Sequence, residues 1–294
     1  DMAVNVVISS MFLIISFFYT DIFGLKPTHM GILFLAARLV DAITDPLMGY
    51  ISDRTNSRFG RRKPWIAIAA PMLMLGLYKL YFPPADATWV YLLGWNVVNS
   101  FGITMLLIPY YSWGAELSPD YDDRSRITGA RAMAGVVGQF IAQFVPAAAL
   151  FFFAIGGTEN ILQIVGITML VLMPICVTVT LVGTPHSTNF VPSKIPVFEG
   201  IKIMFTNKAF LLLIFSFVLG NLGLTITMPL YFFFTQNVLG AVDQSIYMLC
   251  IYFVSNIFGV PFWVWLAGKW GKHRSYILAF VTISLAHPFY LLLG

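Results

Sequence analysis

Long apolar runs separated by short polar segments make up nearly the whole chain, and this alternation restricts it to a membrane fold. About nine runs are long enough to cross the hydrocarbon core of a bilayer, which takes about 20 mostly apolar residues as a helix. Their approximate bounds are 2–20, 29–51, 65–83, 88–115, 129–153, 161–183, 210–235, 244–268 and 276–294. Only 10% of the residues are charged and the mean hydropathy is +0.82, whereas soluble proteins carry about 25% charged residues. We therefore predict an all-α membrane protein.

Basic residues in the loops between these runs alternate from one loop to the next. The loops after the second, fourth, sixth and eighth runs carry nearly all of them, including Arg54, Arg124, Lys202 and Lys269. The intervening loops hold Lys26 and mostly acidic residues. Positive loops face the cytoplasm, so we expect the start of the chain to be cytoplasmic. Confinement of the charge to short loops argues against nucleic-acid binding, which needs a broad basic face.

One long polar segment, residues 184–209, separates the first six runs from the rest. Its prolines at 185, 192 and 196 favour an extended linker. The stretch VFEGIKIMF within it is typical of a short helix at a membrane surface. We expect three parts: a six-helix bundle at 1–183, a cytoplasmic linker with this short helix at 184–209, and the first part of a second bundle at 210–294.

Two stretches at equivalent places in the two halves resemble each other. PLMGYISDRTNSRFGRRKPW begins at Pro46, and PFWVWLAGKWGKHRSY begins at Pro261. Each contains a proline, an aromatic-rich helix end, a glycine, a basic cluster and an aromatic residue that opens the next run. Halves that repeat in the same sense are typical of major facilitator transporters, whose substrate site lies near the midplane between the halves.

Three charged residues lie inside the second apolar run. Arg38, Asp41 and Asp45 recur at intervals of three and four residues, so they share one helical face, with Thr44 at its edge. Acids at the membrane centre cost roughly 3 kcal/mol each on insertion scales, and they usually mark an ion or proton path. Arg38 could form a structural pair with one aspartate, but one arginine cannot neutralise two carboxylates. Two acids beside a hydroxyl suit a small hard cation or a proton, and the sequence does not choose between Na⁺ and H⁺.

Polar and small residues form further stripes at intervals of four. The stripes are Asp1, Asn5 and Ser9; Asn96, Ser100 and Thr104; Ala130, Ala134, Gly138 and Ala142; and Arg131, Gly135, Gln139 and Gln143. The stripe of small residues indicates close packing of helices in lipid. The polar stripe at Arg131 either bonds neighbouring helices or lines an aqueous cavity.

Several stretches together resemble a known family. These are FYTDIFGL at 18–25, DAITDP at 41–46, SDRTNSRFGRRKPW at 52–65, IPYYSWGAEL at 108–117 and DYDDRSR at 120–126. They are similar to the glycoside–pentoside–hexuronide:cation symporters, the melibiose-permease-like branch of the major facilitator superfamily. The resemblance implies two six-helix bundles related by a parallel repeat, of which this chain would hold about nine of twelve transmembrane helices. It also implies inward sugar movement coupled to Na⁺, Li⁺ or H⁺ by alternating access.

The resemblance assigns residues to two sites. It implies that Asp41 and Asp45 bind the coupling cation, assisted by the hydroxyls of Thr44 and Thr104. Asp1, Arg131 and Tyr111 match sugar-contacting positions. Asn5 lies in the same polar stripe as Asp1, and Gln139 lies in the same polar stripe as Arg131. Leu107 stands where melibiose permeases have an aspartate that grips galactoside hydroxyls, which argues against an α-galactoside substrate.

The basic loop at 52–65 is similar to the superfamily's cytoplasmic gate. The gate candidates are Asp53, Arg54, Arg58, Arg61 and Arg62, with Glu116 and Asp120 as acidic partners. In that family, charge pairs and helix ends hold the inner side closed. The simpler alternative is that the arginines only fix topology, but an aspartate among them favours a gate.

The function expected from these features is cation-coupled symport of a sugar or glycoside. A lysolipid symporter shares the aspartate motif but needs an apolar groove, which the glutamines in the fifth run disfavour. A membrane-embedded enzyme lacks support, since the chain has no HExxH or GxSxG motif, and a channel or sensor would not need the repeat. We expect no cofactor or metal beyond the coupling ion, no nucleic-acid partner, a monomer, and a bacterial inner membrane as location.

Overall fold

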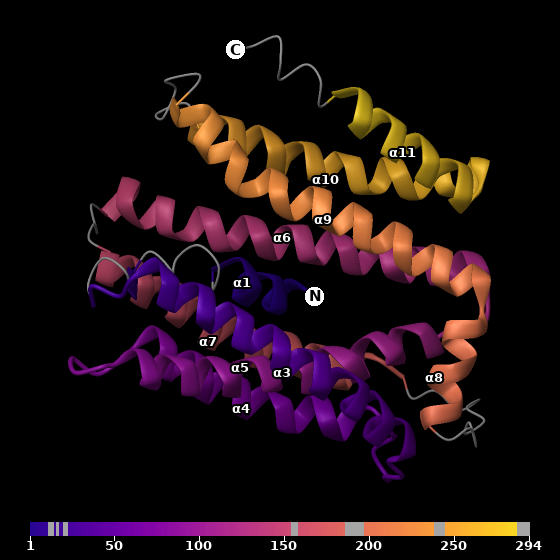
Figure 1. Cartoon of the computed structure of the whole chain (residues 1–294), viewed down its shortest axis with the longest axis horizontal. Helices are drawn as coiled ribbons and strands as arrows, with labels where there is room; N and C mark the ends of the chain where they lie inside the picture. The colour runs from indigo at the N-terminus through magenta and orange to yellow at the C-terminus, as the bar shows by residue number, and fades with distance from the viewer. Residues whose placement is uncertain are drawn as a thin grey trace. The chain divides into compact units, whose positions relative to one another are not determined.

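The computed structural model describes residues 1–10, 15, 18–19, 23–153, 158–185, 197–237 and 245–286, and all regular structure in these ranges is helical. The helices are α1 (Met2–Ser10), α3 (Pro27–Arg54), α4 (Lys63–Tyr81), α5 (Trp89–Glu116), α6 (Tyr121–Phe153), α7 (Thr158–Gly183), α8 (Val197–Thr206), α9 (Lys208–Asn237), α10 (Ser245–Trp270) and α11 (Lys272–Ala286) (Figure 1). The prediction of an all-α protein is confirmed for the described residues.

The chain forms two compact units, Asp1–Pro192 and Ser193–Gly294. Their boundary falls inside the predicted linker at 184–209. The helix α8 occupies the part of this linker that was expected to be a short interfacial helix. The linker prolines at 192 and 196 lie outside the residues whose structure is described.

Three of the described helices are long and apolar enough to cross a membrane: Lys63–Tyr81, Trp89–Glu116 and Glu159–Gly183. The helix α3 is also 28 residues long, but Arg38, Asp41 and Asp45 lower its mean hydropathy. On α7, apolar side chains four residues apart are more than half exposed: Ile167, Val171, Ile175 and Val179. An exposed apolar stripe of this kind suits a helix that faces lipid.

The core of the first unit lies where α4 packs on α5 and α7, and where α5 also packs on α3 (Figure 1). Leu73, Leu77 and Leu80 of α4 are fully buried there. A Cβ atom on Gly102 of α5 would come within 2.9 Å of the Leu73 side chain. The glycine therefore lets the two helices approach closely, as small residues do at helix contacts in membranes.

The helices α1 and α6 form a second close pair. Gly138 of α6 faces the backbone carbonyl of Met2, and a Cβ atom at this position would overlap that carbonyl. Ala142, one turn further along α6, is buried. The prediction that this stripe of small residues packs closely against another helix is confirmed at Gly138.

The repeated stretches of the two halves share a backbone feature. In the first, α3 ends at Arg54, Gly60 follows with a φ of 90°, and α4 begins at Lys63. In the second, α10 ends at Trp270, Gly271 has a φ of 84°, and α11 begins at Lys272. Positive φ values in this range favour glycine because it lacks a Cβ atom. Each repeat thus has a glycine with positive φ between its two helices, in a loop of residues 55–62 in the first and as the single residue Gly271 in the second.

Candidate functional site

The acid pair of α3 lies against a pair of hydroxyl groups on α5. Asp41 and Asp45 are one turn apart on α3, and Ser100 and Thr104 are one turn apart on α5. The Ser100 hydroxyl donates a hydrogen bond to Oδ1 of Asp41. The Thr104 hydroxyl donates to Oδ1 of Asp45 at 2.7 Å. Each carboxylate is thus matched by one hydroxyl from the neighbouring helix, because both helices repeat every 3.6 residues.

Thr44 lies next to these two carboxylate–hydroxyl pairs. Its hydroxyl oxygen lies 3.4 Å from that of Thr104 and donates to the backbone carbonyl of Val40 at 2.9 Å. The structure therefore brings together the four residues predicted for the cation site. Oxygen donors of this kind, two of them carboxylates, suit a small hard cation. No cluster of three or more His, Cys, Asp or Glu side chains forms within the described ranges.

Arg38 pairs with only one of the two acids. Its Nη1 lies 3.2 Å from Oδ2 of Asp41, and its own side chain is 66% exposed. Asp41 therefore has one oxygen on an arginine and the other on Ser100, whereas Asp45 receives its hydrogen bond from Thr104. A structural ion pair with Arg38 accounts for Asp41 but leaves the charge of Asp45 unexplained.

A second polar cluster lies between α1 and α6. Nε of Arg131 is 2.8 Å from Oδ2 of Asp1, and the two side chains are 23% and 9% exposed. The guanidinium carbon of Arg131 lies 4.7 Å from the ring centroid of Tyr110 and 4.5 Å from that of Tyr111. Such distances are typical of cation–π contacts. The arginine is thus held by a carboxylate and two aromatic rings.

This cluster borders a pocket of about 290 Å³. Its lining residues are Asp1, Asn5, Thr128, Arg131, Ala132, Gly135, Val136 and Gln139. Four of the five residues predicted to bind substrate line it, and the fifth, Tyr111, contacts Arg131. The side chains of Ser9 and Gln143, which continue the predicted polar stripes, lie outside the described part of the structure. Leu107 packs against the apolar core.

Glycines make room for the polar side chains of this pocket. A Cβ atom on Gly114 of α5 would lie 2.9 Å from Nη1 of Arg131, and one on Gly135 of α6 would lie 2.9 Å from Nδ2 of Asn5. Real Cβ contacts are longer than this, so a side chain at either position would displace its polar neighbour. The position of Arg131 therefore depends on a glycine in another helix.

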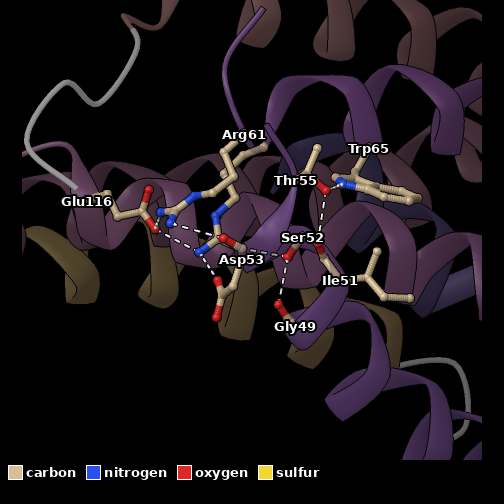
Figure 2. Close-up of polar contacts among 9 residues, drawn as sticks. Gly49, Ile51, Ser52, Asp53, Thr55, Arg61, Trp65 and Glu116 are labelled. Atoms are coloured by element: carbon tan, nitrogen blue, oxygen red, sulfur yellow. Dashed lines mark hydrogen bonds and ion pairs between the residues drawn. The ribbon is translucent and has the colours of Figure 1, made fainter. Parts of the chain in front are cut away.

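A third cluster joins the ends of α3 and α5 through the loop that precedes α4 (Figure 2). Oε1 of Glu116 accepts hydrogen bonds from Arg61 at 2.6 Å and from Arg62 at 2.8 Å. Arg62 also lies 2.5 Å from Oδ1 of Asp53 and donates to the Ser52 hydroxyl at 2.7 Å. Arg62 is only 5% exposed, so its charge depends on these acidic partners.

The other residues predicted for the gate lie elsewhere. Arg54 lies over the ring of Tyr50 at 4.1 Å, and Arg58 lies over Phe59 at 4.6 Å. The carboxylate of Asp120 accepts hydrogen bonds from the backbone N–H groups of Asp122 and Asp123 at 2.8 and 3.0 Å. Asp120 therefore caps the start of α6, where the first N–H groups of a helix have no partner within it.

The family model described as "MFS/sugar transport protein" matches residues 1–293 of the chain. The chain belongs to this family. The isoprimeverose transporter of Lactiplantibacillus pentosus is 26% identical over 95% of this chain and 59% of its own length. The putative glycoside/cation symporter YagG of Escherichia coli is 30% identical over 47% of this chain and 31% of its own. The sodium-dependent lysophosphatidylcholine symporter 1 of Gallus gallus is 24% identical over 92% and 57%.

Family membership confirms the resemblance seen in the sequence and the major facilitator fold class, and it makes the chain an integral membrane protein. The chain spans less than three fifths of the length of these three relatives.

Three contributors to these clusters were not assigned from the sequence. Ser100 was placed in a polar stripe but not in the cation site, although its spacing from Thr104 equals that of Asp41 from Asp45. Ser52 is fully buried and accepts a hydrogen bond from Arg62. The ring of Tyr110, like that of Tyr111, contacts the guanidinium of Arg131. Matching intervals of four on two helices was the available signal for Ser100, whereas nothing in the sequence singles out Ser52.

Proposed function

We propose that this protein is a cation-coupled symporter of a sugar or glycoside that works by alternating access. The observation that carries the proposal is the pairing of two membrane carboxylates on α3 with two hydroxyls on α5, within the unit that also holds the Asp1–Arg131 pocket. The family and the printed names of the sugar and glycoside relatives support a sugar as the substrate.

The coupling ion would bind at Asp41 and Asp45. Burying a charge in a membrane is costly unless it is paired, and a cation between the two carboxylates supplies that pairing. The hydroxyls of Thr44 and Thr104 add neutral oxygens that replace water around the ion. Na⁺ and H⁺ are both compatible with this set of groups.

The helix α5 links the two sites. Thr104 contacts Asp45, and Tyr110 lies against Arg131 only six residues further along the same helix, about 9 Å along its axis. An ion that draws α3 towards α5 therefore also fixes the ring that supports the arginine of the pocket. Binding of the ion and of the sugar then strengthen each other by the same factor, as linkage requires.

The cluster of Asp53, Arg61, Arg62 and Glu116 would act as the cytoplasmic gate. It fastens the end of α3 to the end of α5 through the loop between α3 and α4 (Figure 2). Release of these pairs would let the ends separate when the loaded protein opens inward. In this account the start of the chain is cytoplasmic, and the protein is a monomer in a bacterial inner membrane.

A lysolipid symporter of the same fold is the second candidate. It is supported by the similarity to the sodium-dependent lysophosphatidylcholine symporter 1 over 92% of the chain. Such a substrate needs an apolar groove for its acyl chain. The described pocket instead has carboxylate, guanidinium, amide and hydroxyl groups in its lining, so we place the sugar first.

The test is binding of a panel of radiolabelled sugars to the purified full chain, with and without Na⁺ and across pH, for the wild type and Asp45→Asn. We expect one or more sugars to bind, with affinity that rises with Na⁺ or with acid, and the variant to lose this dependence. The matched control is Asp86→Asn, which removes a carboxylate from an exposed loop and should behave as the wild type. If no sugar binds, or if Asp45→Asn keeps its full ion dependence, the proposal fails.

A further inference from the structure

The charged side chains that line the pocket between α1 and α6 balance each other. The Asp1 carboxylate supplies one negative charge and the Arg131 guanidinium one positive charge, and the side chains of the remaining six lining residues are uncharged. The two charges lie 2.8 Å apart. A ligand that carries its own charge would disturb this balance, whereas a neutral ligand would not.

Arg131 is also engaged on more than one side. Its Nε faces Asp1, its guanidinium lies against Tyr110 and Tyr111, and its Nη1 sits where Gly114 leaves room. A carboxylate on a ligand would have to displace Asp1 or lie beside it. Either arrangement leaves a carboxylate poorly paired in a partly desolvated site, which is costly.

Neutral hydroxyl groups fit the same surroundings. The carboxylate of Asp1 accepts hydrogen bonds, and the amides of Asn5 and Gln139 both donate and accept them. A site built to bond hydroxyl groups discriminates strongly against ligands that leave its polar groups unpaired. The volume of about 290 Å³ lies just below the range of about 300–1,000 Å³ for ligand sites, which suits a single ring.

We propose that this pocket selects an uncharged sugar ring, a pentoside or hexoside, over the hexuronide of the same configuration and over a phosphocholine headgroup. The inference rests on the proposed function and adds the charge class of the substrate. Asp1 is then a specificity-determining residue, because its carboxylate keeps Arg131 from binding an anion.

The experiment compares three rings that differ only at C6: methyl β-D-xyloside, methyl β-D-glucoside and methyl β-D-glucuronide, alongside the galacto series and lysophosphatidylcholine. The affinity of the purified full chain for each compound is measured at saturating Na⁺ and at acid pH. We expect a neutral ring to bind at least about tenfold more tightly than its uronide, a difference of about 1.4 kcal/mol. Asp1→Asn should shift the ratio about tenfold towards the uronide, and Asp86→Asn should leave it unchanged.

Asn5→Asp is a second variant that does not remove Asp1. It adds a negative charge to the pocket, so it should shift the ratio further towards the neutral ring. If the wild type binds the uronide or lysophosphatidylcholine more tightly than every neutral ring, the charge class is wrong while symport still stands. If Asn5→Asp moves the ratio towards the uronide, the pocket is not the site of selection. If no ring binds under any ion condition, the proposed function and this inference both fail.

Discussion

At the scale of single residues, the cation site depends on which hydroxyl faces which carboxylate. Ser100 and Thr104 are both buried and each serves one aspartate. The oxygen of a serine can hold a carboxylate in place and can also contact an ion between the helices. Ser100 is therefore the site residue whose removal changes the oxygens around Asp41 without changing any charge.

Replacing Ser100 by alanine should weaken the response of sugar binding to Na⁺. The loss of one hydrogen bond to a charged group is worth about 1.5–3 kcal/mol, so we expect the half-saturating Na⁺ concentration to rise about tenfold or more. The measurement is Na⁺-dependent sugar binding to the full chain. Ser100→Thr keeps the hydroxyl and should restore most of the response.

The control for this prediction is Ser112→Ala, the same change three turns further along α5. It should leave the Na⁺ response as in the wild type. Equal Na⁺ responses in Ser100→Ala and the wild type would show that this hydroxyl plays no part in ion binding.

The position of Arg131 gives a second prediction at this scale. Gly114→Ala places a methyl group 2.9 Å from Nη1 of Arg131, and the end of a flexible side chain moves more easily than a backbone. We expect the protein to fold with little loss of stability but to bind sugar about tenfold more weakly, a loss of about 1.4 kcal/mol. Thermal unfolding and sugar binding are measured on the same sample. Unchanged sugar affinity would show that the exact placement of the guanidinium does not matter.

At the scale of helices, the start of a helix expected from hydropathy differs from the start that its capping residue sets. The fifth apolar run was expected at 129–153, but α6 begins at Tyr121. Its first turns carry Asp122, Asp123 and Arg124 and are capped by Asp120, so the helix extends beyond its apolar part. The run of acidic residues at the start of a helix was visible in the sequence. Of these residues only Asp120 was assigned to the gate, as an acidic partner at the end of the fourth run.

Close packing of α1 on α6 gives a prediction about stability. Gly138→Ala puts a methyl group against the backbone of Met2, and backbone cannot move as a side chain end can. We expect a loss of about 1–3 kcal/mol in the free energy of unfolding, measured as a lower midpoint of thermal unfolding in detergent. Gly94→Ala is the control, since nothing lies within 4 Å of a Cβ atom there. A Gly138→Ala protein as stable as the control would contradict the close approach of the two helices.

The charged cluster that joins the ends of α3 and α5 gives a prediction about access to the pocket from the cytoplasm. Glu116→Gln removes the carboxylate shared by Arg61 and the buried Arg62, so the cytoplasmic ends should separate more readily. A cysteine introduced as Val136→Cys, at a half-buried position in the pocket lining, in a cysteine-free background, reports this opening by its rate of labelling with a maleimide from the cytoplasmic side. We expect the labelling rate to increase about threefold to tenfold. This corresponds to a shift of about 0.7–1.4 kcal/mol in the free energy of opening.

Glu159→Gln serves as the control for the gate, since it removes an exposed carboxylate at the start of α7. It should leave the labelling rate unchanged. A Glu116→Gln rate equal to that of this control would mean that the arginines only fix topology.

At the scale of the whole molecule, the sequence predicted the helices well and their contacts poorly. The expected runs at 29–51, 65–83 and 88–115 match α3, α4 and α5 within three residues at either end, because length and hydropathy define a membrane helix locally. The meeting of Ser100 with Asp41 depends on the register of α5 against α3, which no local pattern contains. The same holds for Ser52 behind Arg62. The charges were predictable because they are costly in lipid, and Thr44 and Thr104 were assigned through the family resemblance, whereas Ser100 and Ser52 were not assigned.

The most direct test of coupled transport is to measure sugar and ion movement together. The full chain is reconstituted in liposomes without an ion gradient, a sugar that binds is added outside, and Na⁺ and H⁺ entry are followed. The account predicts that the sugar drives one of these ions inward in a fixed ratio, that Asp45→Asn abolishes this movement, and that Asp86→Asn retains it. Sugar entry without movement of either ion, or ion entry that is the same in Asp45→Asn, would contradict it.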